Sequence, residues 1–349
     1  MNGGGRSGGP RGSVGRSTGA TRCADWIRPV HPERRRLPRS PADPAEPRCP
    51  TCRRGLYWVR AMTSPKISVV IPTINRHEIL DQTVASLLDQ TCTGQEIIVV
   101  DQSESAADCT SGPLSDPRVR YFRVSRRGSP RGRNYGIARA RAEIVFSGDD
   151  DIIASPQLLQ AHLHCYGDPE VGGVAGRVLT REDKPLPPNP AVGTVNWCTG
   201  KMVANFHATQ RQRVWHVQGS NCSFRASALR QVGGFDKAFT GIGHFEEPDL
   251  AFRVVRAGWK LVFEPRAESQ HLQFDGGGNR PRSFHERTFW HFHNYAVLYR
   301  RHFRQCCLPL FCACQVARAV GYAVRERDPA LACTALGALW RGFTRPTPW

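Results

Sequence analysis

Short apolar runs alternate with amphipathic segments along the chain from residue 66 onward. The runs KISVVIP (66–72), QEIIVV (95–100) and EIVFS (143–147) have the length and composition of buried strands. Between the first two runs, residues 78–90 predict a helix because apolar side chains recur at helical spacing, at Leu80, Val84, Leu87 and Leu88. A strand, a helix and a second strand in this order predict a right-handed βαβ unit with parallel strands.

The pattern continues toward the C-terminus. We expect strands over residues 119–124, 219–225 and 260–264, and helices over residues 133–142, 226–232 and 246–257. Residues 168–214 are richer in Gly, Pro and polar groups, which indicates a long excursion that shapes a substrate cleft. The chain then turns aromatic and basic, and we expect helices over 283–304, 311–326 and 329–343. The predicted fold class is α/β, with a mostly parallel sheet flanked by helices and a C-terminal helical appendage.

Three consecutive carboxylates, Asp149–Asp151, follow the strand over residues 143–147. Adjacent acids repel one another unless a cation or cationic partner lies beside them. Mg²⁺ prefers such oxygen ligands and often shares them with substrate phosphates. Thr73 and Asp101 follow or end the two earlier strands, so the carboxyl ends of parallel strands are expected to bring all these side chains to one edge of the sheet. For the triplet alone, a solvated acidic turn is the alternative.

The net charge of +18 is unevenly distributed. Residues 1–62 carry 13 Arg and 4 acidic residues, so half of the excess lies there, and the rest is spread without a basic block. This distribution gives little support for nucleic-acid binding and is compatible with an anionic lipid surface or a nucleotide-sugar. Residues 1–61 lack apolar periodicity, so we expect a disordered basic leader, or a segment absent from the mature protein, before a main domain over 62–275.

Cysteine usage and the C-terminal region bear on location. Thirteen cysteines without a framework spacing, and no apolar segment typical of a secretory signal, indicate reduced thiols and a cytoplasmic protein. Within residues 276–349 the most apolar run is Leu308–Ala317, which is about 10 residues long and is followed by Arg318. A membrane-spanning helix needs roughly 20 residues. Arginines beside aromatic and apolar residues favour either an interfacial membrane surface or a helical cap on the main domain.

Five runs of sequence together resemble the family 2 glycosyltransferases, which use nucleotide-sugars and have the GT-A fold. The runs are ISVVIPTINR (67–76), EIIVVDQS (96–103), GRNYGIARARAEIVFSGDDD (132–151), SFRASALRQVGGFD (223–236) and EEPDLAFRVVRAGW (246–259). The resemblance extends over about residues 66–275. By contrast, no Gly-rich phosphate loop of the dinucleotide-binding type follows the first strand.

The resemblance implies roles for the residues at the predicted sheet edge. Asp101 is expected to hydrogen-bond the base of the donor and Asp149 its ribose, while Asp151 binds Mn²⁺ or Mg²⁺ that bridges the diphosphate. His271 matches a residue that completes the metal coordination in many relatives, and a polar surface role is its alternative. Further donor-binding candidates are Thr73, Arg133, Asn134 and Asp150.

The resemblance also places the general base near residue 246. The family pattern is Glu-Asp-x-Asp-Leu, in which the second residue commonly acts as the base. This chain has Glu246-Glu247-Pro248-Asp249-Leu250, so Glu247 occupies the base position and Glu246 is the second candidate. Asp249 falls two positions further on and is expected to cap the helix or orient a neighbouring side chain.

These assignments imply an inverting, metal-dependent, non-processive glycosyltransferase. The expected donor is a UDP-, GDP- or dTDP-sugar, and the expected acceptor is a hydroxyl of a glycan or lipid-linked molecule of the cell envelope. The expected location is the cytoplasm, including the inner face of the cell membrane, where an anionic membrane surface is a further partner. A catalytically inactive GT-A domain that binds nucleotide-sugars or acts as a scaffold is the alternative.

Overall fold

The computed structural model describes residues 64–344 except 240, 243, 275, 279 and 280, so the predicted leader lies outside the described residues. Nine strands of the described chain form one sheet, in the order β3-β2-β1-β4-β10-β6-β11-β5, with β9 pairing with β11. Their bounds are β1 Ile67–Thr73, β2 Gln95–Asp101, β3 Val119–Arg123, β4 Ile144–Gly148, β5 Ile152–Ala154, β6 Val171–Leu179, β9 Gln212–Arg213, β10 Asn221–Arg225 and β11 Lys260–His271.

The first four strands of the sheet are parallel, as the sequence pattern predicts. β1 pairs in parallel with β2 and with β4, and β2 pairs in parallel with β3. The antiparallel strand β10 lies between β4 and β6, and β11 is parallel to β6. A separate hairpin joins β7 Thr194–Val195 to β8 Met202–Val203.

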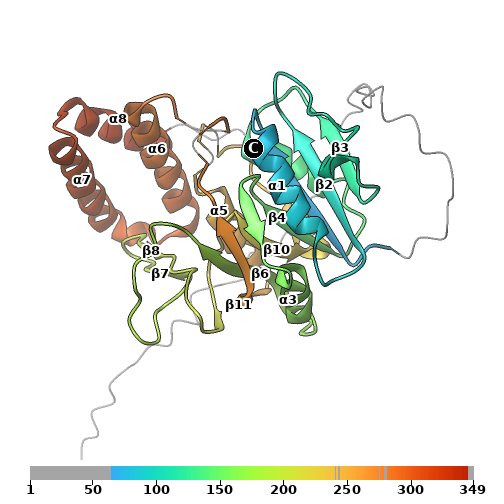
Figure 1. Ribbon diagram of the computed structural model, residues 1–349. Coiled ribbons are helices and arrows are strands. Elements are labelled where there is room, and N and C mark those ends of the chain that lie inside the picture. Colours follow the sequence, from blue (N-terminus) through green and yellow to red (C-terminus); the bar gives the residue numbers. More distant parts are fainter. Residues whose placement is uncertain (1–63, 240, 243, 275, 279–280, 345–349) are drawn as a thin grey trace, which may run out of the picture.

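Helices cover both faces of this sheet and enclose two apolar cores. On one face lie α1 His77–Leu88 and α3 Leu158–Cys165, whose buried leucines belong to one apolar core with side chains of β1, β2 and β6. On the other face lie α2 Ser129–Ile137, α4 Ala226–Val232 and α5 Glu246–Arg256. A short 3₁₀ turn, η3 Pro113–Ser115, precedes β3. The predicted α/β class is confirmed, and Figure 1 shows the layered arrangement.

The central strand β6 lies inside the segment that the sequence pattern assigns to a polar excursion. Glycine weakens a strand when it has no packing role, so a run containing Gly172, Gly173 and Gly176 does not resemble a buried strand. Here the glycines give neighbouring side chains room. A Cβ on Gly176 would lie 2.3 Å from Asn221 Oδ1, and one on Gly173 would lie 2.7 Å from Phe224.

Two other elements differ from their predicted bounds. α2 ends at Ile137 rather than at residue 142, because the backbone N–H groups that follow leave the helix: that of Arg141 donates to Glu96 Oε1 at 2.7 Å, and that of Ala142 donates to Ser68 Oγ at 3.0 Å. β11 continues to residue 271 instead of ending at residue 264, with a register shift between Glu264 and Glu268. A bulge at this point accommodates a proline inside the strand.

The C-terminal region forms three helices beside the sheet, α6 Phe284–His302, α7 Leu308–Arg325 and α8 Ala330–Thr344, with a 3₁₀ turn, η4 Gln305–Cys307, before α7 (Figure 1). They share a core to which Phe252 of α5 contributes. Residues Gln305–Arg325 are the one candidate membrane span among the described residues, with a mean hydropathy of 1.5 and 22% of the span's most apolar window buried. This candidate span includes Arg318 and extends beyond the apolar run Leu308–Ala317 that the sequence shows.

Candidate active site

The carboxyl ends of β1, β2 and β4 meet at one edge of the sheet. In the parallel register Thr73 pairs with Asp101, and the acidic triplet follows directly after β4. This is the edge predicted from the strand ends. In open α/β sheets such an edge is where nucleotides bind.

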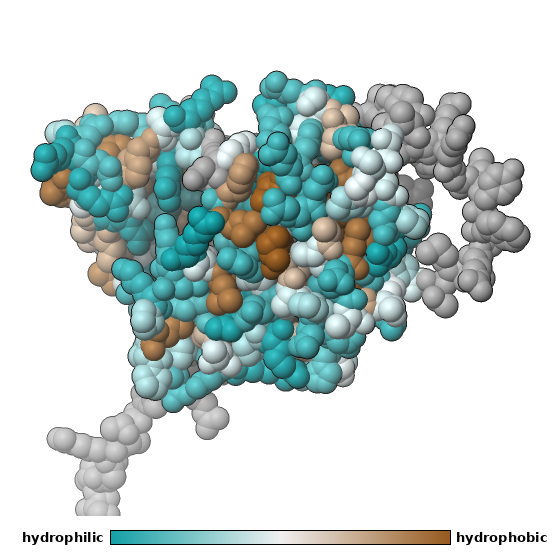
Figure 2. Space-filling model, in the orientation of Figure 1, coloured by the Kyte–Doolittle hydropathy of each residue, from teal (hydrophilic) through white to brown (hydrophobic). Residues whose placement is uncertain are grey.

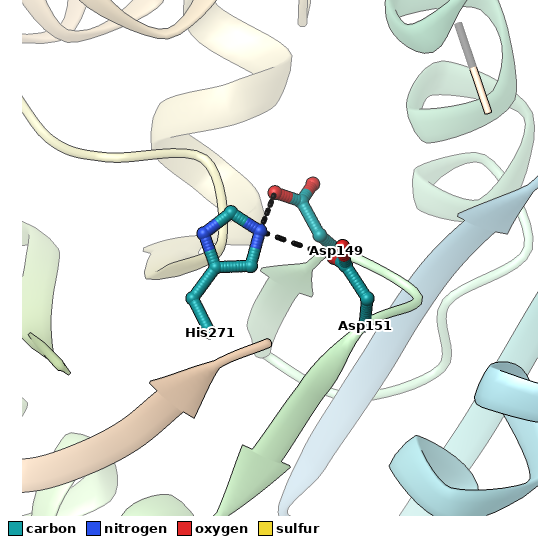
Figure 3. Close-up of side chains that lie close together, drawn as sticks. All are labelled: Asp149, Asp151 and His271. Atoms are coloured by element: carbon teal, nitrogen blue, oxygen red, sulfur yellow. Dashed lines mark hydrogen bonds and ion pairs between the residues drawn. The ribbon is translucent and has the colours of Figure 1, made fainter. Parts of the chain in front are cut away.

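Asp149, Asp151 and His271 form an acid–imidazole cluster at this edge (Figure 3). His271 Nε2 lies 3.1 Å from Asp151 Oδ1 and 3.9 Å from Asp149 Oδ2. Burial works against a charged imidazole, yet Asp151 and then Asp149 raise the pKa of His271. One ligand atom from each residue lies within 4.8 Å of the other two.

This donor set fits a divalent cation. Two carboxylate oxygens and one imidazole nitrogen are ligands that Mn²⁺ accepts, and oxygen-rich sites of this kind also suit Mg²⁺. A second set of contacts positions the ligands: the backbone N–H of Phe274 donates to Asp151 Oδ2 at 3.0 Å, and that of Leu272 donates to the Asp151 carbonyl at 2.9 Å. The segment after β11 and the turn between β4 and β5 are thus tied together.

Arg76 is the cation beside the middle carboxylate. Its Nη1 lies 2.9 Å from Asp150 Oδ1 and 3.4 Å from Asp151 Oδ2, while Thr73 donates to Asp150 Oδ2 at 2.6 Å. Burial raises the pKa of Asp150 to about 6, although Arg76 opposes that effect. Sequence analysis gave Arg76 no role; its place in the run ISVVIPTINR, across the sheet edge from three acids, is the signal that could have found it.

Arg133 links the acidic triplet to the start of α5. Its Nη2 donates to Asp149 Oδ1 at 2.9 Å, and its Nη1 donates to Glu247 Oε1 at 2.6 Å and to Glu246 Oε1 at 3.1 Å. The guanidinium is buried and lies over the ring of Phe235. One arginine therefore joins three carboxylates from two distant parts of the chain.

The two glutamates of α5 differ in exposure. The side chain of Glu246 is 1% exposed and that of Glu247 is 14% exposed. Burial, reinforced by the charge of Glu247, raises the pKa of Glu246 well above its ordinary value. Burial also raises the pKa of Glu247, an effect that Arg133 opposes and Asp149 reinforces. Glu246 is therefore the carboxyl whose ionisation burial opposes more strongly, and Glu247 is the more accessible of the two.

The backbone just before these glutamates is strained. Phe245 has φ 75°, a left-handed conformation that a bulky residue rarely adopts, and its ring stacks on Tyr295 with centroids 4.8 Å apart. At the next turn Asp249 is fully buried between α5 and α6, where it accepts hydrogen bonds from Arg253 and His302 at 2.8 Å. Burial works to raise the pKa of Asp249, but these two residues and Arg301 hold it well below its ordinary value.

Two predicted donor-binding side chains have internal partners. Asp101 is fully buried, and its carboxylate accepts hydrogen bonds from Tyr121, from His77 Nε2 at 3.1 Å and from the backbone of Ser103 at 2.8 Å. The amide of Asn134 is occupied by the backbone of Phe235, donating to its carbonyl at 2.7 Å and accepting from its N–H at 2.9 Å. In this structure Asn134 holds the turn that places Phe235 under Arg133.

The sequence is similar to a family of glycosyltransferases and to individual members of that class. The model of the family described as "Glycosyl transferase family 2" matches residues 68–233. Validoxylamine A glucosyltransferase of Streptomyces hygroscopicus subsp. limoneus is 29% identical over 222 residues, covering 54% of this chain and 48% of that protein. Pre-mycofactocin glycosyltransferase of Mycobacterium tuberculosis is 30% identical over 212 residues, covering 59% and 42%. The chain thus spans less than half the length of these two relatives.

A solved structure shares the fold. The mannosyltransferase PcManGT from Pyrobaculum calidifontis, in complex with GDP-Man and Mn²⁺, superimposes with a TM-score of 0.51 at 16% identity. The alignment covers 81% of this chain and 88% of that one. The overlap extends beyond the family match, and it supports the GT-A architecture of the sheet that carries the acid–imidazole cluster.

Proposed function

Residues 68–233 belong to glycosyl transferase family 2, and on this premise we propose that the chain is an inverting, metal-dependent, non-processive glycosyltransferase. It transfers a sugar from a nucleoside diphosphate to a hydroxyl of a glycan or lipid-linked acceptor. The observation that carries the proposal is the single arginine, Arg133, that joins Asp149 of the acid–imidazole cluster to Glu247 at the start of α5. A donor-side group and an acceptor-side base are thereby held within one hydrogen-bonded unit.

The donor is assigned to the sheet edge. Asp149, Asp151 and His271 would hold Mn²⁺ or Mg²⁺, and the PcManGT complex, which contains Mn²⁺, supports a divalent ion at the equivalent fold. When bound, the ion neutralises negative charge on the leaving diphosphate. Thr73, Asp101 and Asp150 remain predicted donor contacts. Asp101 already accepts hydrogen bonds from Tyr121 and His77, so it must release one of them to bind the nucleobase of the donor.

Glu247 is assigned the role of general base. Its carboxylate takes the proton of the acceptor hydroxyl while the acceptor oxygen bonds to the anomeric carbon. The bond from that carbon to the diphosphate oxygen breaks on the opposite face, and its electron pair leaves with the nucleotide, so the anomeric configuration inverts. Arg133 favours the ionised form of Glu247 and holds its carboxylate in one position, and Glu246 accepts a hydrogen bond from the same guanidinium on the buried side.

A donor screen tests this proposal. Purified protein is incubated with UDP-, GDP- and dTDP-sugars, with Mn²⁺, Mg²⁺ or EDTA, and released nucleoside diphosphate is measured. Metal-dependent release with one donor, lost in Asp151→Ala, is the expected result. Donor binding without release of nucleoside diphosphate would favour the alternative of an inactive binding module. Activity that EDTA does not change would remove the metal ion from the proposal.

We also assign the exposed face of α7 to an anionic membrane surface. Several of its apolar side chains face outward, since Leu310 is 50% exposed, Val320 50% and Val324 72%, while Phe311 and Ala319 are buried on the opposite face. Figure 2 shows apolar side chains among polar ones over α7 and α8. Arg325 and Arg327 are exposed at the end of the helix, where they complement acidic lipid headgroups.

Vesicle flotation tests that assignment. Phosphatidylglycerol vesicles at low salt are expected to carry the protein upward, and phosphatidylcholine vesicles much less. Val320→Asp with Val324→Asp is expected to abolish flotation without lowering the melting temperature, since both side chains are exposed. Equal flotation of that variant would leave α7 as a helical cap only.

A further inference from the structure

A basic site outside the candidate active site lies between α6, α7 and the segment that leads into α5. It is a cavity of about 270 Å³ lined by His244, Phe284, Arg287, Thr288, His291, Tyr322 and Arg325. We call it the basic pocket. None of its described lining residues is acidic, and neither the donor site nor the proposed base occupies it.

The charge of the basic pocket comes from arginines. Arg287 is exposed, and in the described part of the chain no acidic partner faces it; Arg325 pairs with Glu326 at 2.8 Å and lies over the rings of Phe284 and Tyr322. Burial, then the charge of Arg287, lowers the pKa of His244 to about 4. Burial, then its basic neighbours, lowers the pKa of His291 to about 3. The imidazoles are therefore neutral at pH 7, and the positive charge of Arg287 has no acidic partner within the described part of the chain.

One polar group of the pocket lacks a partner inside the described protein. The side chain of Thr288 is 1% exposed, and its Oγ1 makes no hydrogen bond to any described group. A buried hydroxyl without a partner costs stability, about 1–3 kcal/mol in typical proteins. A ligand oxygen in the pocket would satisfy this hydroxyl and at the same time supply the missing negative charge.

The segments that form the basic pocket are close in sequence to residues of the candidate active site. His244 precedes Glu246 by two positions, and its carbonyl accepts a hydrogen bond from Asn294 of α6 at 3.2 Å. α6 begins at Phe284, thirteen positions after His271. One lining residue, His244, is thus three positions from the proposed base Glu247 along the chain, whereas none of the lining residues belongs to the strand edge assigned to the nucleotide.

We propose that the basic pocket binds a phosphate or diphosphate group carried by the acceptor. The inference rests on the proposed function, and it names the acceptor class: a phosphorylated sugar whose free hydroxyl reaches Glu247. Arg287 and Arg325 supply the charge, and Thr288 donates its hydroxyl to a phosphate oxygen. A soluble sugar phosphate and a lipid-linked sugar phosphate both present this chemistry. The lipid-linked form is compatible with the position of the pocket, because Tyr322 and Arg325 lie on α7, the same helix as the outward-facing Val320 and Val324.

Direct binding is measured first, with phenyl phosphate as the probe and EDTA present so that the acid–imidazole cluster does not contribute. Isothermal titration of the full chain is expected to show one site. The double variant Arg287→Gln, Arg325→Gln is expected to weaken binding at least about tenfold, and Thr288→Val severalfold. The matched control is Arg327→Gln, an exposed arginine of the same region outside the pocket lining, which should bind like the wild type. Unchanged affinity in the double variant, or no binding by the wild type, would overturn the proposal.

Transfer assays then connect the pocket to the acceptor. Three acceptors with the same sugar are compared: a neutral alkyl glycoside, a soluble glycosyl phosphate and a polyprenyl diphosphate glycoside in detergent. The double variant should lose at least about tenfold in kcat/KM for the phosphorylated acceptors only, while donor hydrolysis without acceptor is unchanged. Preference for the lipid compound identifies a membrane source, and equal use identifies a soluble one. Equal losses on the neutral glycoside would refute the proposal, whereas absence of any donor use would refute the proposed function and leave the titration to decide the pocket.

Discussion

Gly219→Ala offers a sharp test of the link between Arg133 and Glu247. Gly219 lies just before β10, and a Cβ at this position would lie 2.0 Å from Glu247 Oε1 and 2.8 Å from Arg133 Nη2. Real contacts of this kind are not shorter than 3.0 Å, so the Glu247 carboxylate must move by at least about 1 Å. The salt bridge at 2.6 Å then breaks or reorients.

The expected effect is large on activity and small on folding. A displacement of about 1 Å at a catalytic group can cost about 100-fold in rate. The clash involves the end of a side chain, so the stability cost should stay within about 1–3 kcal/mol. The assay compares kcat/KM for transfer with the melting temperature, and Gly337→Ala on α8, where an added Cβ meets nothing within 4 Å, is the control.

A double-mutant cycle separates the clash from other causes. In a Glu247→Ala background the obstructed carboxylate is gone, so adding Gly219→Ala should cost little further activity. Wild-type transfer by the single Gly219→Ala variant would refute the assigned position of Glu247. Additive losses in the double variant would show that the glycine acts through another group.

Three further outcomes are expected. Asp151→Asn should remove Mn²⁺ binding measured by titration calorimetry, while the Phe274 N–H retains an acceptor and the fold is kept. His162 and His216 are buried with pKa values lowered to about 4, so the unfolded state binds protons that the folded state does not; the free energy of unfolding should fall from pH 6.5 toward pH 4, by about 1.4 kcal/mol per pH unit for each histidine, and less steeply in His162→Gln. Removing residues 1–61 should leave the melting temperature and donor turnover unchanged, and a fall of several degrees would show that they pack on the domain.

Sequence patterns predicted the parallel half of the sheet well. β1, β2 and β4 are nearly continuous apolar runs that end in, or are followed by, polar residues, so these strands and the edge they share follow from the sequence pattern. β6 could not be predicted in the same way, because Gly173 and Gly176 are determined by how closely Phe224 and Asn221 approach the strand. The strand predicted over 260–264 was also too short, because β11 continues past Pro265 through a register shift between Glu264 and Glu268.

The site was predicted in part, for a similar reason. Acids after a strand and acids at a helix start are visible in sequence, but their partners are not. The sequence offered no partner for Arg76, which the fold places beside Asp150 and Asp151. Arg133 was expected only as a donor contact, and the fold places it between Asp149 and Glu247, which lie far apart in the sequence. The basic pocket was equally hidden, since His244, Arg287 and Arg325 are brought together only by the packing of α6 and α7.

The most direct test of the account compares Glu247→Gln with Glu246→Gln. Both changes replace a carboxyl group that accepts a hydrogen bond from Arg133, but the side chain of Glu247 is 14% exposed and that of Glu246 only 1%. Turnover on acceptor and the dissociation constant of the donor are measured for each variant. If Glu247 is the general base, Glu247→Gln should lose at least about a hundredfold in turnover, in line with the roughly 10²–10⁴-fold contribution of a general base. Donor binding should be retained, and Glu246→Gln should lose less turnover. A larger loss in Glu246→Gln, or full turnover in Glu247→Gln, would contradict this assignment.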